Sequence, residues 1–433
     1  MARTATDMMD ENWKTSDRKR ISIIRNALFD LMLTIEILIV IIDKSALHFG
    51  YEGQVFRITF LINVIIVILG IYEGFKDNPG DVKKGITGFY SLWQWGLLLV
   101  VGLIAVIDYK TSGRNEMLRF LMVIATCRKL DVTKKLKIFF FETLGGCTIL
   151  VLLSLLGILG EVQKLSGTTG QMQYVLGMGD PNALHCMFLM IVLLAIYLYM
   201  DKMKWYHYLA LVIADIILWR MTGSEIGAGV TLLAIIAAVI VQVTRIKDYK
   251  FPYITGIVLL IFEILFSIWS ACLSVYSIGQ SQSSAMDELR AMGREAVLID
   301  YWLEDILKLV NRILTGRITY LYWGNEHHQG AIYSWHLFAD DKYEIYYDMG
   351  FCRLFFWYGW IPAFCVIGLI IFVYIWAMLK KDGKTLVVLS CMCIYTVVEA
   401  HLVSVYAGRN FGLLLMGLYI MNLAREEHGN ERG

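Results

Sequence analysis

The chain has 433 residues, of which 58% are hydrophobic and only 18% are charged. A soluble domain of this length could not bury so much apolar surface, so the composition favours an integral membrane protein. The net charge of +1 leaves no basic excess for binding nucleic acid. The eight cysteines lie mostly in or beside apolar segments and do not indicate a disulfide framework.

Apolar runs near membrane-spanning length recur along the whole chain. They predict an all-α integral membrane protein with about twelve transmembrane helices. The fourth run is short and contains a charged residue, Arg119. The runs cover residues 27–42, 56–72, 89–107, 115–127, 138–160, 183–200, 205–219, 226–243, 252–276, 351–379, 385–402 and 410–424.

The distribution of lysine and arginine predicts the orientation of these spans. One alternate set of connections, which includes both termini, carries 24 Lys and Arg residues, and the short connections of the other set carry 7. The positive-inside rule therefore places both termini in the cytoplasm. The expected divisions are a cytoplasmic tail, nine spans, a large extracytoplasmic loop, three spans and a second cytoplasmic tail, at 1–26, 27–276, 277–349, 350–424 and 425–433.

The loop at 277–349 breaks the pattern of short connections. Its first part has apolar residues at steps of three and four from Leu289 to Ile313, which predicts an amphipathic helix, divided near Gly293 and ending at Gly316. Such a helix would lie on the membrane surface or cap a cavity between the spans. The second part is rich in Tyr, Trp, His and Asp, and so long a loop is typical of a functional segment.

Several ionisable residues fall inside apolar runs, where a charge is costly unless it faces the interior of the helix bundle or a wet cavity. They are Glu36, Glu142, Asp215, Glu263, Glu399 and His401. Pairing between helices or protonation would also account for each of them. Because the outer connection after Glu399 contains Arg409 and Asn410, we expect these residues to meet at the outer end of one cavity.

Three arginines on the expected outer face, Arg220, Arg317 and Arg409, each lie close to a glycine. Guanidinium groups bind phosphate through paired hydrogen bonds, and nearby glycine lets a ligand approach the backbone, so this pattern suits an anionic ligand. The alternative is that the arginines reach towards lipid headgroups, as many arginines at span ends do.

Histidines and aspartates in the second part of the loop raise two possibilities, a metal site and a general base. Their spacing matches no compact set of metal ligands, so no metal is expected. His336, Asp340 or Asp341 is more plausible as a general base, because a hydroxyl nucleophile must lose a proton. The Gly383-Lys384-Thr385 sequence lacks the first glycine of a phosphate-binding loop and follows no expected strand, so we expect no nucleotide site there.

The order of these features resembles the bacterial O-antigen and capsule polymerase family (Wzy), which is related to the O-antigen ligases. Five local patterns carry the resemblance, and it covers roughly residues 138–424. They are GMGDPNALH at 177–185, MTGSEIGAGVTLL at 221–233, the Thr-Gly-Arg element within 309–320, DDKYEIYYDMG at 340–350 and EAHLVSVYAGRNFGLLL at 399–415. Where the family usually has arginine after Thr-Gly-Ser, this chain has Glu225, and Arg220 lies one turn upstream.

The resemblance implies a polysaccharide polymerase that needs no cofactor or metal. Its substrates, and its expected partners besides membrane lipid, would be a donor and an acceptor oligosaccharide, each linked through pyrophosphate to undecaprenol. A protein that regulates chain length is a further candidate partner. The acceptor hydroxyl would displace lipid pyrophosphate with inversion, and fixed positive groups would stabilise the leaving charge.

The resemblance also implies which residues form the site. Arg317 and Arg409 would stabilise the leaving group, and His336, Asp340 or Asp341 would orient or deprotonate the attacking hydroxyl. The expected substrate-binding residues are Arg220, Asn182, Glu399, Asn410, Tyr343 and Trp323. A ligase that transfers finished glycan, a flippase for lipid-linked sugars and a non-catalytic assembly protein are the alternative functions.

Overall fold

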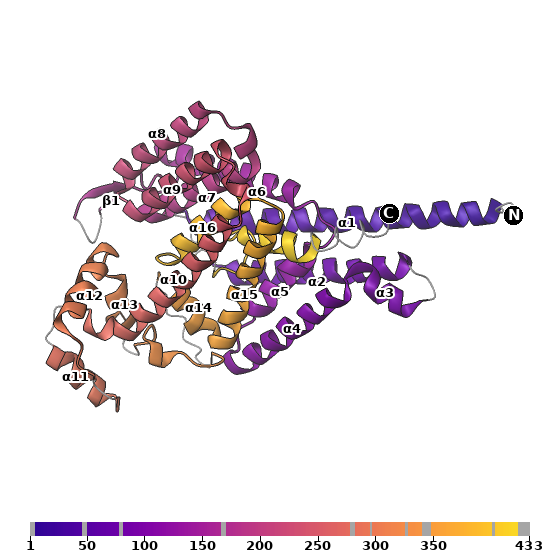
Figure 1. Ribbon diagram of the computed structural model, residues 1–433. Coiled ribbons are helices and arrows are strands. Elements are labelled where there is room, and N and C mark those ends of the chain that lie inside the picture. Colours follow the sequence, from indigo (N-terminus) through magenta and orange to yellow (C-terminus); the bar gives the residue numbers. More distant parts are fainter. Residues whose placement is uncertain are drawn as a thin grey trace.

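The computed structural model describes residues 5–45, 50–77, 81–165, 170–277, 282–294, 297–324, 328–339, 348–400 and 403–422 (Figure 1). Most of this part of the chain is helical, and very little of it is strand. The long helices are α1 (Ala5–Asp43), α2 (Glu52–Asp77), α4 (Leu92–Ser112), α6 (Val132–Leu155), α7 (Pro181–Tyr199), α8 (Trp205–Thr222), α9 (Glu225–Val243), α10 (Phe251–Leu273) and α15 (Trp360–Leu379).

Shorter helices complete the described fold. They are α3 (Val82–Phe89), α5 (Glu116–Thr126), α11 (Gln282–Ala291), α12 (Tyr301–Ile313), α13 (Arg317–Trp323), α14 (Gly350–Tyr358), α16 (Gly383–Thr396) and α17 (Gly412–Gly417), which continues as a π-helical turn, Leu418–Asn422. A two-stranded antiparallel hairpin, β1 (Gln163–Leu165) and β2 (Met172–Tyr174), pairs Gln163 with Tyr174. The sequence patterns did not predict this hairpin.

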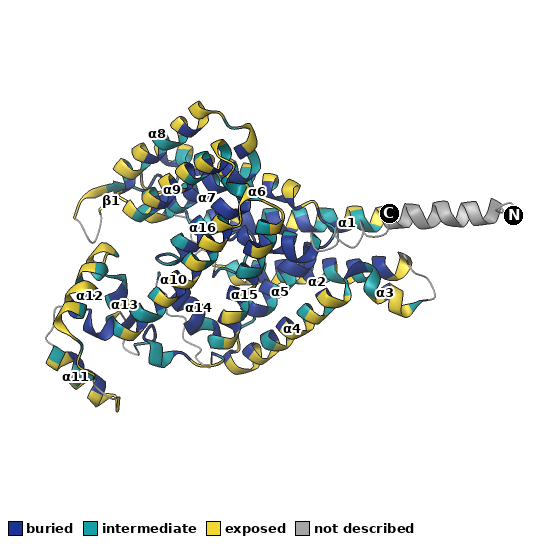
Figure 2. Ribbon diagram, in the orientation of Figure 1, coloured by how far each residue is buried: buried dark blue, intermediate teal, exposed yellow. Residues whose placement is uncertain are grey.

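Among the described residues, seven helices are long and apolar enough to cross a membrane, namely α2, α4, α6, α7, α9, α10 and α15. Large apolar side chains are exposed along their outer faces, for example Leu99 and Leu103 on α4 and Phe262 on α10. Figure 2 shows exposed residues along α4 and α10. In water such a surface would aggregate, so these seven helices indicate an all-α protein embedded in a membrane.

The remaining expected spans fall on helices that do not meet these criteria. Runs 27–42 and 205–219 lie in the longer helices α1 and α8, whereas runs 115–127, 385–402 and 410–424 correspond to the short helices α5, α16 and α17. The run 351–379 is divided at Gly359, where a φ of 87° ends α14 and α15 begins. At a rise of about 1.5 Å per residue, α5 is roughly 16 Å long, about half the thickness of the hydrocarbon core.

The short helices α5, α16 and α17 lie in the centre of the bundle and are largely buried. Every residue of α17 is buried, and Gly417 brings this helix against the turn after α5. A Cβ atom at Gly417 would lie 2.4 Å from the sulfur of Cys127, so only glycine permits this approach.

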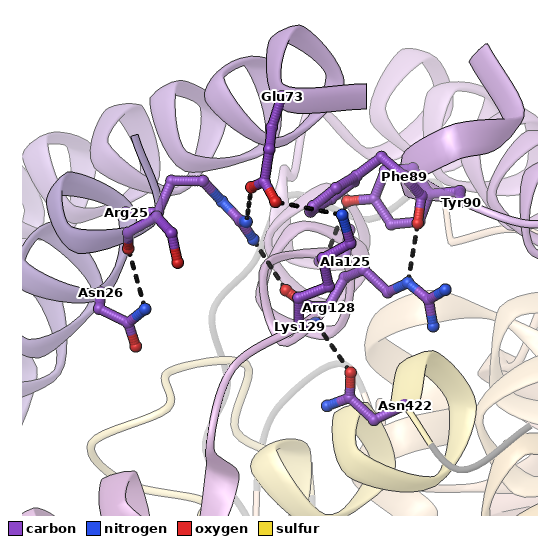
Figure 3. A network of polar contacts seen from close by, with 10 residues as sticks. Arg25, Asn26, Glu73, Phe89, Tyr90, Ala125, Arg128, Lys129 and Asn422 are labelled. Carbon is purple, nitrogen blue, oxygen red and sulfur yellow. Dashed lines mark hydrogen bonds and ion pairs between the residues drawn. The ribbon is translucent and has the colours of Figure 1, made fainter. Parts of the chain in front are cut away.

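One end of the bundle is held together by a network of buried ionic and polar contacts (Figure 3). Arg25 of α1 pairs with Glu73 of α2 at 2.7 Å, and Lys129 reaches the other Glu73 oxygen at 3.1 Å. Arg25 also donates to the backbone oxygen of Arg128, and Asn422 accepts from the backbone nitrogen of Lys129 at 2.8 Å. We call these five residues the Arg25 network. It joins α1, α2, the turn after α5 and the end of the π-helical turn.

The extramembrane segment expected at 277–349 contains α11, α12 and α13. These helices lie at the end of the molecule opposite α3 (Figure 1). The turn between α11 and α12 includes Gly293 at a φ of 68°. Asn311 joins α12 to α13 because its amide donates to Thr319 at 2.7 Å and accepts from the Thr319 backbone nitrogen at 3.0 Å.

We predict that replacing Glu73 with glutamine strongly destabilises the protein. The change leaves the Arg25 guanidinium, whose side chain is 1% exposed, without its charged partner, which typically costs about 3–5 kcal/mol. The melting temperature of the detergent-solubilised protein measures the effect. The matched control is Asp81→Asn, which removes the exposed pair with Lys84 and keeps a residue that caps helices well. Equal melting temperatures for the two variants would contradict the prediction.

Candidate functional site

The connection between α16 and α17 is irregular backbone held within the bundle. α16 ends at Thr396 and α17 starts at Gly412, so the described residues 397–400 and 403–411 are not helical, although the apolar runs predicted helix up to residue 402 and from residue 410. Asn410 is fully buried and holds this connection, since its amide donates to the Ser404 oxygen at 3.0 Å and accepts from the Gly412 nitrogen at 3.0 Å. Irregular backbone at membrane depth is tolerated only where protein buries it or it lines a cavity.

Glycine at position 408 lets this connection touch α1. The Gly408 nitrogen donates to a carboxylate oxygen of Glu36 at 3.2 Å. A Cβ atom at Gly408 would lie 2.4 Å from the backbone carbon of Glu36 and 2.6 Å from the Ile37 nitrogen. The buried carboxylate of Glu36 therefore satisfies a backbone donor of the connection, which explains an acidic residue in this apolar run.

A cavity of about 230 Å³ lies beside this connection. We call it the charged cavity, because three cationic side chains and two carboxylates line it. They are Lys44, Arg353, Arg409, Glu116 and Glu399. These residues come from the end of α1, the start of α5, α14 and both ends of the α16–α17 connection. Trp357, Tyr406 and Cys186 line it as well.

Two residues that line the charged cavity carry buried hydrogen-bond donors. The Nε atom of Arg409 and the indole nitrogen of Trp357 are both buried and have no acceptor within the part of the chain that is described. The terminal nitrogen of Arg409 pairs with Asp43. The Arg353 guanidinium lies 3.4 Å from the centre of the Trp357 ring, which orients both side chains. Unused buried donors beside cations suit an anionic group.

Arg317 connects α13 to a residue that lines the charged cavity. Its side chain donates to Glu399 at 3.1 Å and to the backbone oxygen of Val398 at 3.1 Å, and it lies 3.5 Å from Asp348. The preceding residues, Thr315 and Gly316, have φ values of 55° and 83°, so the chain turns sharply before α13 begins at Arg317. The guanidinium thus holds the Glu399 carboxylate at the edge of the charged cavity.

The electrostatic surroundings of Asp348 show how charges gather here. Burial raises the pKa of the Asp348 carboxyl above its usual value, and the positive charges of Arg317, Arg353 and Lys44 oppose that shift. The nearby carboxylate of Asp180, the N-cap residue of α7, raises the pKa further. Three cationic side chains and the carboxylate of Asp180 therefore act on Asp348 at this end of the bundle.

The structure brings together four of the residues that the sequence singled out. Glu399 and Arg409 line the charged cavity, Asn410 holds the connection beside it, and Arg317 contacts Glu399 from the start of α13. Asp340, Asp341, Tyr343 and His401 lie outside the described residues.

The other predicted site residues lie elsewhere in the described structure. Arg220 is exposed at the end of α8, with its guanidinium 5.1 Å from the centre of the Trp219 ring. Asn182 is exposed in the first turn of α7, and His336 is exposed between α13 and α14. Trp323 is partly buried and donates to the Val275 oxygen at 3.2 Å, so its indole nitrogen supports local packing.

Three residues of the charged cavity were missed by the sequence analysis as candidates. Lys44 was counted only as one of the few cations of the short outer connections. Because cations are rare in these connections, each of them could have been considered as a candidate site residue. Arg353 and Glu116 stand at the edges of apolar runs, where a charge is common. Only the fold shows that these edges meet.

Within the described residues, no group of three or more His, Cys, Asp or Glu side chains is placed to hold a metal ion. His328, one of the loop histidines, stacks on Tyr322 with ring centres 3.8 Å apart and lies 3.5 Å from Glu288. Comparisons of the chain with models of protein families, with curated proteins and with solved structures find no match.

We predict that Gly408→Ala disrupts the contact between α1 and the α16–α17 connection. The added methyl group cannot fit against backbone atoms of Glu36 and Ile37, and such overpacking costs about 1–3 kcal/mol. The matched control is Gly368→Ala on α15, where a Cβ atom meets nothing within 4 Å. Melting temperatures in detergent should fall for the first variant alone. An unchanged value for Gly408→Ala would show that the connection does not pack as described.

We also predict a pH dependence that originates at Asp348. Because its pKa is raised in the folded protein, the folded state binds this proton more tightly than the unfolded state. Stability from this group is therefore present at low pH and is lost as the pH rises above the usual aspartate range. Asparagine does not ionise, so Asp348→Asn should not lose this stability as the pH rises. The melting temperature of the variant minus that of the wild type should therefore increase from pH 4 to neutral pH. A constant or shrinking difference would contradict the assignment.

Proposed function

We propose that this protein is a membrane glycosyltransferase that polymerises oligosaccharide repeat units carried on a lipid pyrophosphate, at the outer face of a bacterial plasma membrane. The observation that supports this most is the charged cavity. Residues from segments far apart in the sequence meet there, including two that the resemblance implied, Glu399 and Arg409, and a third, Arg317, contacts Glu399.

The proposed reaction transfers a glycan from one lipid carrier to another. A hydroxyl oxygen of the acceptor sugar bonds to the anomeric carbon of the donor, and the bond from that carbon to the pyrophosphate oxygen breaks. The leaving pyrophosphate takes the electron pair, and the hydroxyl proton passes to a base. Since pyrophosphate is already a good leaving group, the protein must chiefly stabilise the negative charge that develops on it.

Lys44, Arg353 and Arg409 are suited to bind the pyrophosphate, because all three line the charged cavity and Arg409 retains an unused buried donor. A guanidinium binds adjacent phosphate oxygens through parallel hydrogen bonds. The positive groups are held in place before substrate binds, so little reorganisation is needed as the leaving group forms.

Glu399 is the best-placed described residue for accepting the proton. It lines the charged cavity, and Arg317 fixes its carboxylate from outside at 3.1 Å. In this scheme Glu399 orients and deprotonates the acceptor hydroxyl, and Arg317 is a positioning residue. Because Arg317 lies at the start of α13, the extramembrane segment would complete the site.

Replacement of Arg409 by glutamine should abolish most polymer formation. Loss of one fixed donor to a developing oxyanion typically lowers the rate about 10²–10³-fold. The measurement is the length of the polymer and the location of lipid-linked repeats in cells that express each variant at equal levels. We expect single lipid-linked repeats to accumulate on the outer face.

The control is Arg220→Gln, which removes an exposed arginine on α8 and should leave polymer length unchanged. Arg317→Gln should act like Arg409→Gln, although through the position of Glu399. Repeats that remain on the cytoplasmic face would instead support a flippase. Normal polymer from both cavity variants would refute the proposed site.

A further inference from the structure

An apolar groove lies on the outside of the bundle where α6, α7 and α8 meet. It has a volume of about 230 Å³, and its walls include Leu144, Val151 and Leu152 of α6, Met187 and Ile191 of α7, and Leu218 of α8. The groove opens on the same kind of exposed apolar surface that covers the seven long helices. We call it the α6–α8 groove.

The α6–α8 groove and the charged cavity share one wall, the first turns of α7. Met187 lines both. On one side of it, Cys186 and Met190 line the charged cavity, and on the other side Phe188 and Ile191 line the groove. Residues three or four apart share a helix face, so one face of α7 lines the charged cavity and another lines the α6–α8 groove. Met187 lies between these two faces.

This arrangement fits a ligand that combines a charged head with a long apolar chain. The head would meet Lys44, Arg353 and Arg409, which are the cations of the charged cavity. The chain would pass Met187 and lie in the groove, where apolar walls exclude water without offering hydrogen bonds. Neither hollow alone would distinguish such a ligand from a soluble phosphate or from a bulk lipid chain.

We propose that the α6–α8 groove binds the chain units next to the pyrophosphate of a polyprenyl pyrophosphate, with the pyrophosphate held in the charged cavity. This inference rests on the proposed function for the choice of a lipid pyrophosphate as the substrate. It adds the route of the chain. The lipid reaches the site sideways from the membrane, between α6 and α8 and across α7.

Binding of radiolabelled polyprenyl pyrophosphate to the full-length protein in lipid nanodiscs tests the groove. Leu152→Trp fills the groove, and Ile149→Trp places the same side chain on the same helix outside it. The two positions are matched because Leu152 is 53% exposed and Ile149 is 58% exposed. We expect binding to weaken about tenfold in Leu152→Trp, as when a few chain methylenes leave an apolar site, and to stay unchanged in Ile149→Trp.

Inorganic pyrophosphate serves as the probe for the head alone. Because Leu152→Trp leaves the charged cavity intact, pyrophosphate should bind this variant as tightly as it binds the wild type. Pyrophosphate should therefore displace the labelled lipid from the variant more easily, by the same factor by which lipid binding has weakened. Equal lipid binding by wild type and Leu152→Trp would overturn the proposal and would indicate that bulk lipid chains occupy the groove. Equal weakening in both tryptophan variants would overturn it too.

The result separates the groove from the enzymatic function. If Leu152→Trp loses lipid binding but the wild type makes no polymer, the result supports the groove as the binding site of the lipid chain and refutes the polymerase proposal. If the wild type makes polymer and Leu152→Trp binds lipid normally, the polymerase proposal stands and the groove fails.

Discussion

Backbone polar groups inside a membrane must find partners within the protein, and this constraint shapes the centre of the molecule. The α16–α17 connection carries irregular backbone between two short helices. The buried side chain of Asn410 accepts from the Gly412 nitrogen and donates to the Ser404 oxygen, Glu36 accepts from the Gly408 nitrogen, and Gly408 allows the connection to lie against α1. The long helices then serve to enclose this centre, and the charged cavity exists because the connection is not helical.

Polar side chains gather at two ends of the bundle and perform different tasks. In the Arg25 network, Arg25 and Lys129 both pair with Glu73, as expected for a structural anchor, and the Nε atom of Arg25 is buried without an acceptor among the described residues. The charged cavity contains Arg409 and Trp357 with unused donors, as expected for a site that receives a ligand. Along α1, Arg25 and Asp43 are separated by roughly 27 Å, close to the thickness of a hydrocarbon core.

The acidic residues found within apolar runs have different explanations. Glu142 accepts from Thr34 at 2.7 Å, and Asp215 lies 3.0 Å from the buried His185 ring, so both are explained by pairing between helices. The His185 contact also explains why two of the family-like patterns lie together, since Gly227 of the second pattern packs against the ring of His185 from the first. Glu263 differs, because both of its carboxylate oxygens are buried without a hydrogen-bond partner among the described residues.

The amino-acid sequence alone was enough to predict an all-α membrane protein, because apolar composition and run length report directly on the solvent that surrounds each segment. It also singled out Arg317, Glu399 and Arg409 as candidate site residues, because charges within or beside apolar runs need a structural or functional reason. It could not give the lengths of α5, α16 and α17, because a buried helix in a bundle is as apolar as one that spans lipid. Nor could it join Lys44, Glu116 and Arg353 to the same cavity. Their meeting depends on how helices distant in the chain pack, and hydropathy, which is a local property, contains no information about that contact.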